Sequence, residues 1–181
     1  MRLFIAANFD EKIVSALTEL QEGLRKNGAE GNFTRPENLH LTLAFIGEYG
    51  NPEDVLDMME MVSFQSMPLC VEGLQHYRDM YLLRMQGNTE LESYVKRLRR
   101  ILAEQGIPFD RKKFSPHITL IRKVSFRNGS LELPERLPEI PFCINKVSLM
   151  RSERGKKGMI YTELGSVESK LPKTIFKNIV I

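Results

Sequence analysis

The chain has 181 residues, of which 42% are hydrophobic and 27% are charged, as in an ordinary soluble globular protein. Its net charge of +3 excludes a generic nucleic-acid coat protein. No apolar run reaches the roughly 18 residues of a membrane span, and residues 3–7 resemble a strand rather than a signal peptide, so we expect a cytoplasmic protein with no membrane partner. A chain of this length can bury roughly 70% of its unfolded surface, which is enough for one domain over residues 1–181 without disulfide or metal staples.

The first part of the chain predicts a strand, a helix and a second strand. Residues 3–7 favour the strand, and residues 10–27 have the apolar spacing of a helix that Asp10 begins as N-cap. The second strand covers residues 39–43, and a short helix with proline in its first turn begins after Asn51.

The second part repeats this order. Residues 68–75 and 80–85 predict consecutive strands, and a long helix follows from a capping box formed by Thr89 and Glu92. Residues 116–120 then predict another strand.

The end of the chain predicts a frame for these elements. We expect a surface connection over residues 128–141, which contain three prolines, and a hairpin between residues 144–150 and 159–164. Cys70 and Cys143 lie in apolar, strand-like segments without CxxC spacing, which predicts buried, inert thiols.

One short motif occurs twice, as His40-Leu41-Thr42 and as His117-Ile118-Thr119. Successive side chains of a strand point to opposite faces, so each motif presents an imidazole and a hydroxyl on the same face. The remaining histidine, His76, has no such partner and is expected at a turn or rim.

A shift of 77 residues along the chain carries His40 onto His117, and the same shift superimposes the predicted strands and the long helices of the two parts. We call this shift the repeat offset. We therefore predict an α+β fold that is bilobal. Two halves of antiparallel sheet are related by a pseudo-twofold axis, with helices on the outside and an active-site cleft between the sheets.

Paired imidazoles indicate acid/base chemistry near neutral pH. Neither motif supplies the closely spaced second ligand typical of a zinc site, and no G-x-S-x-G elbow or cysteine beside a histidine indicates a nucleophile. One neutral imidazole can take a proton from water while a protonated one gives a proton to a leaving oxygen. The hydroxyls of Thr42 and Thr119 can donate to an anion between the histidines, and a phosphodiester suits this arrangement.

Residues 35–48 and 114–122 closely resemble the paired signatures of the two-histidine phosphoesterases, in particular the RNA 2′,3′-cyclic phosphodiesterase branch, also called the 2′-5′ RNA ligase family. The resemblance implies a monomer with no cofactor and no metal that hydrolyses RNA or oligonucleotide ends bearing a 2′,3′-cyclic phosphate to a 2′-phosphate. It also implies that His40 and His117 are catalytic and that Thr42, Thr119 and Arg122 bind the phosphate.

Some points stay open at this level. Arg122 lies five residues after His117, so regular alternation would place it on the opposite face unless the strand bulges or ends after Leu120. The sequence does not assign acid and base to the two histidines. Two other functions are consistent with the motifs, a 2′-5′ RNA ligase and a non-catalytic module that binds RNA ends. Arg111 to Lys113 could attract a polyanion or form a solvated face.

Overall fold

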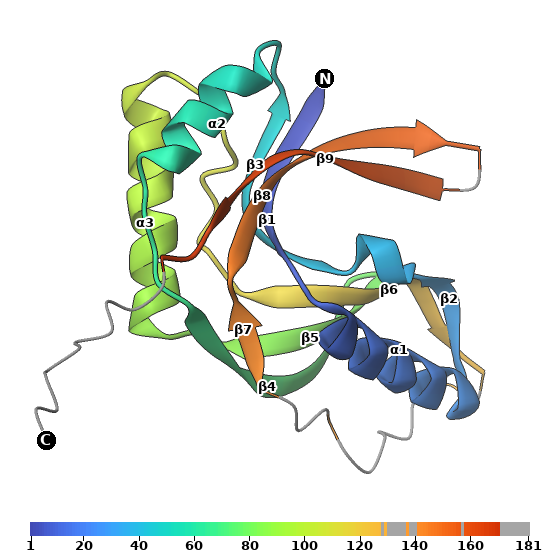
Figure 1. Cartoon of the computed structure of the whole chain (residues 1–181). Coiled ribbons are helices and arrows are strands. Elements are labelled where there is room, and N and C mark those ends of the chain that lie inside the picture. Colours follow the sequence, from blue (N-terminus) through green and yellow to red (C-terminus); the bar gives the residue numbers. More distant parts are fainter. Residues whose placement is uncertain (128, 130–136, 138–140, 157, 171–181) are drawn as a thin grey trace, which may run out of the picture.

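Nine strands form one curled antiparallel sheet (Figure 1). The structure is a computed structural model, and it describes residues 1–127, 129, 137, 141–156 and 158–170. The strands are β1 (Arg2–Asn8), β2 (Ala29–Phe33), β3 (His40–Glu48), β4 (Met67–Tyr77), β5 (Met80–Gln86), β6 (His117–Phe126), β7 (Phe142–Ile144), β8 (Lys146–Gly155) and β9 (Gly158–Glu168). The helices are α1 (Glu11–Lys26), the 3₁₀ turn η1 (Pro36–Asn38), α2 (Pro52–Glu60) and α3 (Thr89–Glu104).

The order of the strands confirms the prediction of two related halves. Along the sheet it runs β7-β4-β5-β6-β3-β1-β8-β9, with β2 added to β6. The two motif strands, β6 and β3, are central neighbours, and β5 and β1, which the repeat offset also relates, flank them. Only one residue pair, Leu41 with Ile118, joins β3 to β6. The halves therefore diverge on either side of this pair.

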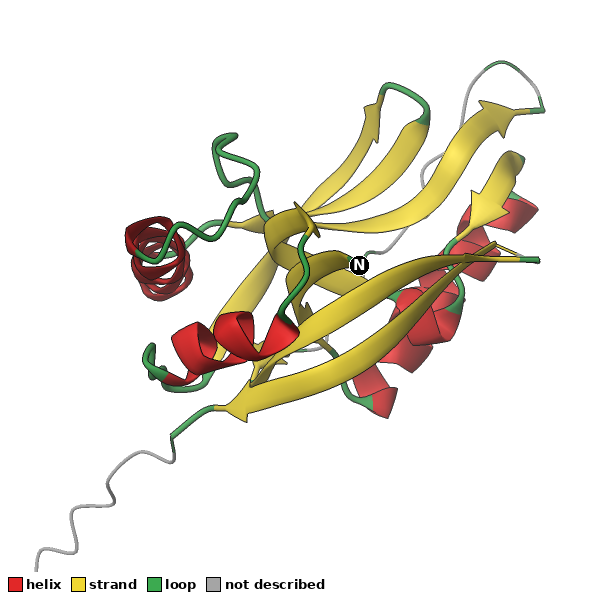
Figure 2. Cartoon of the chain, turned by 90° about the horizontal axis from the view of Figure 1, so that it is seen from above, coloured by secondary structure: helices red, strands yellow, loops and turns green. Residues whose placement is uncertain are grey.

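The long helices cover opposite sides of the molecule, with α1 at one side and α2 and α3 together at the other (Figures 1 and 2). Each long helix also reaches the motif strand of the other half. The Gln21 side chain of α1 donates to the Leu120 carbonyl at 2.9 Å, and Arg99 of α3 donates to the Leu43 carbonyl at 3.1 Å. The repeat offset carries Leu43 onto Leu120, so these contacts stabilise equivalent points where the two strands separate.

Helix ends agree with the sequence except at α3. Asp10 caps α1 by accepting from the Ile13 amide at 2.9 Å. The predicted capping box at Thr89 is wrong, because Asn88 is the N-cap and accepts from the Leu91 amide at 2.8 Å. Asparagine is as good an N-cap as threonine, and here its side chain also donates to the Pro68 carbonyl.

Other differences concern strands and thiols. Strand β2, which the sequence analysis did not predict, pairs with β6. The expectation of buried thiols is wrong for Cys70, which is exposed on β4, and Cys143 on β7 is only half-buried. The predicted hairpin is confirmed as β8 and β9, whereas most of the predicted connection over residues 128–141 lies outside the described residues. In the described part of the chain, no helix is long and apolar enough to span a membrane.

Candidate active site

The pairing of Leu41 with Ile118 brings the two motifs together. Both residues are fully buried in the core. Their neighbours in each strand point to the other face, so His40, Thr42, His117 and Thr119 lie on the same side of the two strands. All four side chains are half-buried on this face.

Both imidazoles are oriented by the same kind of contact. Nδ1 of His40 lies 2.7 Å from the Asn38 carbonyl, and Nδ1 of His117 lies 2.7 Å from the Ser115 carbonyl. Because a carbonyl only accepts, Nδ1 must carry the proton in each neutral ring, which leaves Nε2 as the reactive nitrogen. Nε2 of His40 lies 3.1 Å from the Thr42 hydroxyl oxygen. The repeat offset also carries Asn38 onto Ser115, so the two histidines are held in equivalent ways.

A β-bulge explains how Arg122 reaches the same face. In the pairing of β5 with β6, Leu82 faces Thr119 but Tyr81 faces Ile121, so Leu120 is an extra residue in β6. Leu120 and Ile121 are both fully buried, and the alternation beyond them is reversed. Arg122 therefore lies on the cleft face, which resolves the conflict with regular alternation in favour of a bulge.

The other half has the same bulge but a different residue after it. Ala6 faces Thr42 and Ile5 faces Ala44, so Leu43 is the extra residue in β3. The position equivalent to Arg122 is Phe45, whose ring carries the Arg2 guanidinium at 5.0 Å. The backbone of the site is thus nearly symmetric, whereas its charge is not.

Aromatic side chains shield His40. The ring centroids of Phe4 and Tyr161 lie 5.0 and 5.4 Å from its imidazole. The pKa of His40 is lowered from 6.5 to about 4, chiefly by burial. The hydrogen bond to the Asn38 carbonyl opposes this shift, and the nearby charges of Arg122 and His117 contribute to it. His40 is therefore neutral at neutral pH in the free protein.

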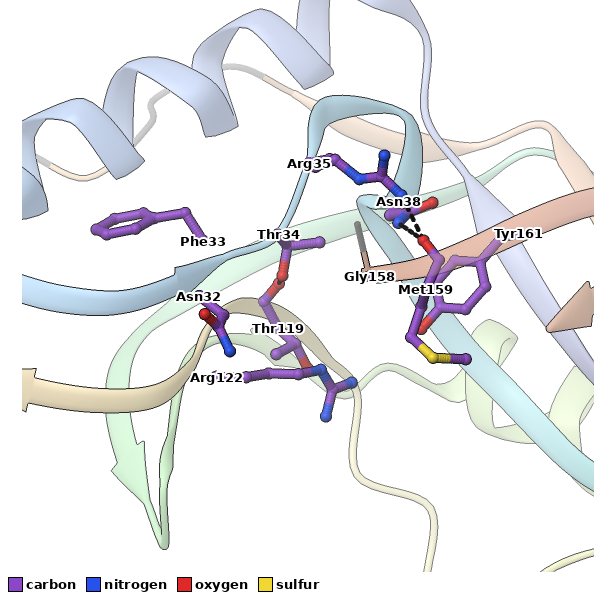
Figure 3. Close-up of a pocket in the computed structure, with 10 residues that line it drawn as sticks. All are labelled: Asn32, Phe33, Thr34, Arg35, Asn38, Thr119, Arg122, Gly158, Met159 and Tyr161. Carbon is purple, nitrogen blue, oxygen red and sulfur yellow. Dashed lines mark hydrogen bonds between the residues drawn. The ribbon is translucent and has the colours of Figure 1, made fainter. Parts of the chain in front are cut away.

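Two adjoining cavities open on this face. The His40 cavity, of about 280 Å³, is lined by His40, Thr42, Phe4, Phe45 and Arg122 among others. The Arg35 cavity, of about 490 Å³, is lined by Arg35, Asn32, Thr34, Thr119 and Arg122 among others (Figure 3). Arg122, Met159 and Tyr161 line both cavities, so the two are immediate neighbours. His117 lines neither of them.

The walls of the two cavities are basic. They include Arg2, Arg35 and Arg122, and no carboxylate of the described residues lines either cavity. Within the same part of the chain, no carboxylate lies within 4.0 Å of the Arg122 guanidinium. Arg111 to Lys113, which the sequence analysis singled out, are exposed and line neither cavity.

Sequence reasoning missed two supporting residues. The Asn38 side chain donates to the Met159 carbonyl at 3.0 Å and so connects the support of His40 to the β8–β9 hairpin. Arg84 pairs with His117 across β5 and β6, and it donates to the Ser115 hydroxyl and to Glu72. The repeat offset carries Asn38 onto Ser115, so it could have indicated these two residues as a pair. Nothing in the sequence indicates that Arg84 pairs with His117.

Metal ligands do not gather at this face. Among the described residues, no group of three or more histidine, cysteine, aspartate or glutamate side chains could hold a metal ion together. His76, expected at a turn or rim, lies exposed on β4, with its ring 5.4 Å from that of Phe126.

Comparisons with known proteins agree with this geometry. The chain matches the family described as LigT like phosphoesterase over residues 9–80 and 83–161. It is 27% identical over 176 residues to a Thermotoga maritima protein named RNA 2′,3′-cyclic phosphodiesterase, with 91% of this chain and 93% of that protein covered. The crystal structure of TT0787 from Thermus thermophilus is 28% identical, with a TM-score of 0.74 and with 93% of this chain and 97% of that chain covered. Escherichia coli LigT shares the fold, with a TM-score of 0.77 at 21% identity and with 94% and 98% of the two chains covered. The paired His-x-Thr strands, their sheet and these matches lead to one conclusion, that the chain belongs to the LigT-like phosphoesterase family.

Proposed function

We propose that this protein hydrolyses a 2′,3′-cyclic phosphate, at the end of an RNA or on a nucleoside, to a 2′-phosphate. In this proposal His40 and His117 are a metal-independent acid/base pair. One observation carries the proposal. Two equivalent His-Thr pairs lie on one face of adjoining strands, and a carbonyl holds Nδ1 of each imidazole. Two reactive Nε2 atoms on one face suit a reaction in which one proton is taken and another is given.

In the proposed reaction, Nε2 of one neutral imidazole takes a proton from a water molecule as its oxygen attacks phosphorus. The bond from phosphorus to O3′ breaks on the opposite side, and the other, protonated imidazole gives its proton to O3′. The product is a 2′-phosphomonoester with a free 3′-hydroxyl. The proton that each histidine gains or loses is then exchanged with solvent, so the pair returns to its starting state.

The remaining polar groups suit the phosphate. The hydroxyls of Thr42 and Thr119 would donate to its non-bridging oxygens, and the Arg122 guanidinium would offset its charge. The Thermotoga maritima relative is named for this activity on RNA, which supports the same class of substrate here. The two histidines supply both proton transfers, so the proposed mechanism needs no metal.

The decisive experiment measures turnover of adenosine 2′,3′-cyclic phosphate by the purified protein with and without EDTA, and identifies the product by chromatography against 2′- and 3′-AMP. We expect 2′-AMP at the same rate in both conditions. Loss of activity with EDTA and its return with zinc or manganese would instead indicate metal-assisted hydrolysis. Binding of RNA ends without turnover would indicate a binding module, and joined RNA products would indicate a ligase.

A further inference from the structure

The His40 cavity is small for a site that binds an RNA. Its volume of about 280 Å³ lies just below the roughly 300 Å³ at which pockets for small organic ligands begin. We therefore expect an RNA whose reacting end lies in this cavity to extend into an adjoining space. In the part of the chain that the structure describes, two cavities share wall residues with the His40 cavity, and we compare how each of them suits a polyanion.

The first neighbour, the Arg2 cavity, is unsuitable. It shares Arg2, Ser152 and Met159 with the His40 cavity, but its walls also include the carboxylates of Glu48 and Glu153. A phosphodiester placed there would face two negative charges, and like charges at short distance repel. These carboxylates offset the cations of the same wall.

The second neighbour, the Arg35 cavity, has the opposite character. It is larger than the His40 cavity, at about 490 Å³, and its described walls hold two guanidinium groups and no carboxylate. The Arg35 guanidinium also pairs at 3.4 Å with the exposed Glu37, which does not line the cavity, whereas the Arg122 guanidinium has no carboxylate of the described residues within 4.0 Å. Arg122 lines both cavities and lies where they meet. A cation in that place can contact the reacting phosphate on one side and the next phosphate on the other.

The walls of the Arg35 cavity also offer neutral contacts. Figure 3 shows Asn32, Thr34 and Arg122 along one side, with Met159 and Tyr161 facing them. The Thr34 hydroxyl donates to the Thr119 carbonyl at 2.7 Å, which ties this wall to the catalytic strand. No other described side chain or backbone group engages the Asn32 amide, so it is available to a ligand. An amide beside a guanidinium suits a sugar-phosphate backbone, and a ring and a thioether suit a base.

We propose that the Arg35 cavity binds the nucleotide that precedes, on the 5′ side, the terminal nucleotide with the cyclic phosphate. Arg35 and Arg122 contact the internal phosphate that joins these two nucleotides, and Asn32 contacts the sugar. This inference rests on the proposed function. It makes the preferred substrate an oligonucleotide end rather than a free nucleoside cyclic phosphate.

The test compares kcat/KM for adenosine 2′,3′-cyclic phosphate with kcat/KM for the dinucleotide ApA ending in the same cyclic phosphate. We expect the wild-type protein to prefer the dinucleotide by about 10-fold or more, the effect of one charge-assisted hydrogen bond. Arg35→Met and Asn32→Ala should each reduce this preference. Arg154→Met is the matched control, because Arg154 is an exposed arginine that lines the Arg2 cavity and its loss changes the net charge equally.

Salt dependence gives a second readout. In a plot of log kcat/KM against log salt concentration the slope is negative, because salt weakens the contacts with phosphate. The slope for the dinucleotide should be steeper by about 0.7 than the slope for adenosine 2′,3′-cyclic phosphate, because the dinucleotide has one internal phosphate. Arg35→Met should remove most of this added slope, whereas Arg154→Met should keep it. Circular dichroism of each variant establishes that it is folded, and Asn32→Ala, a change at an exposed position, tests the cavity if Arg35→Met fails to fold.

The outcomes separate this inference from the proposed function. If neither substrate is hydrolysed, the proposed function itself fails. If the wild-type protein hydrolyses both substrates equally well, or if Arg35→Met and Arg154→Met lose the preference to the same extent, the reaction stands but the subsite in the Arg35 cavity does not exist.

Discussion

His40 should make the fold less stable as the pH falls from 6.5 toward 4. In the folded protein the pKa of His40 is lowered to about 4, whereas in the unfolded chain it takes its ordinary value of 6.5. Below pH 6.5 the unfolded state therefore gains a proton that the folded state does not bind until about pH 4. The stability contributed by neutral His40 is thus fully present above pH 6.5 and is lost through this window.

The size of the effect follows from the difference in pKa. Each pKa unit corresponds to about 1.36 kcal/mol, so lowering the pH from 7 to 5 should cost at most about 2 kcal/mol through this residue. Because His40 is only half-buried, solvent screening reduces this figure, and we expect about 1 kcal/mol or slightly more.

Urea unfolding at pH 7, 6 and 5 measures this contribution, with the far-ultraviolet circular dichroism as the signal. The comparison is between the wild-type protein, His40→Asn and His76→Asn. The last is a matched control, because His76 is exposed on β4 outside the site. We expect the wild-type protein and His76→Asn to lose about 1 kcal/mol more than His40→Asn between pH 7 and pH 5. Equal losses in all three would refute the reasoning that burial keeps His40 neutral.

Three further predictions concern catalysis and the backbone that supports it. His117→Ala should lower kcat by about 10²- to 10⁴-fold with an unchanged circular dichroism spectrum, and retention of more than about a tenth of the activity would contradict its role as acid or base. Thr42→Val, which keeps the shape but removes the donor, should lower kcat/KM for a cyclic phosphate by about 10- to 150-fold, whereas Thr42→Ser should be milder; wild-type kinetics for Thr42→Val would remove this hydroxyl from the phosphate site. Gly31→Ala should lower kcat/KM, and it should lower the free energy of unfolding by about 1 to 3 kcal/mol. Gly31 has φ +137°, and a Cβ there would lie 2.8 Å from the carbonyl oxygens of Arg122 and Lys123. Gly50→Ala, at a glycine with no atom within 4 Å of the added Cβ, is the matched control, and equal effects of the two changes on kcat/KM would show that the contact with Arg122 does not matter.

The sequence by itself predicted most of the secondary structure and the residues of the candidate site. Period-two alternation sets His40 with Thr42, and His117 with Thr119, on one face of a strand, whatever the rest of the fold does. Helical spacing and the internal repeat were enough to predict α1, α3 and the two halves of the sheet. Family resemblance then connected the motifs to cyclic phosphodiesters.

Only the tertiary structure decided which strands pair and in which register, because pairing depends on residues far apart in the chain. The bulge at Leu120 that turns Arg122 into the cleft exists only against β5, and β2, which borders the Arg35 cavity, is stable only against β6. The lowered pKa of His40 likewise depends on burial that only the fold creates, and Tyr161, which is distant in the sequence, lies against the imidazole there. Sequence patterns report the face on which a side chain lies, whereas burial, charge and cavity shape depend on what packs against that face.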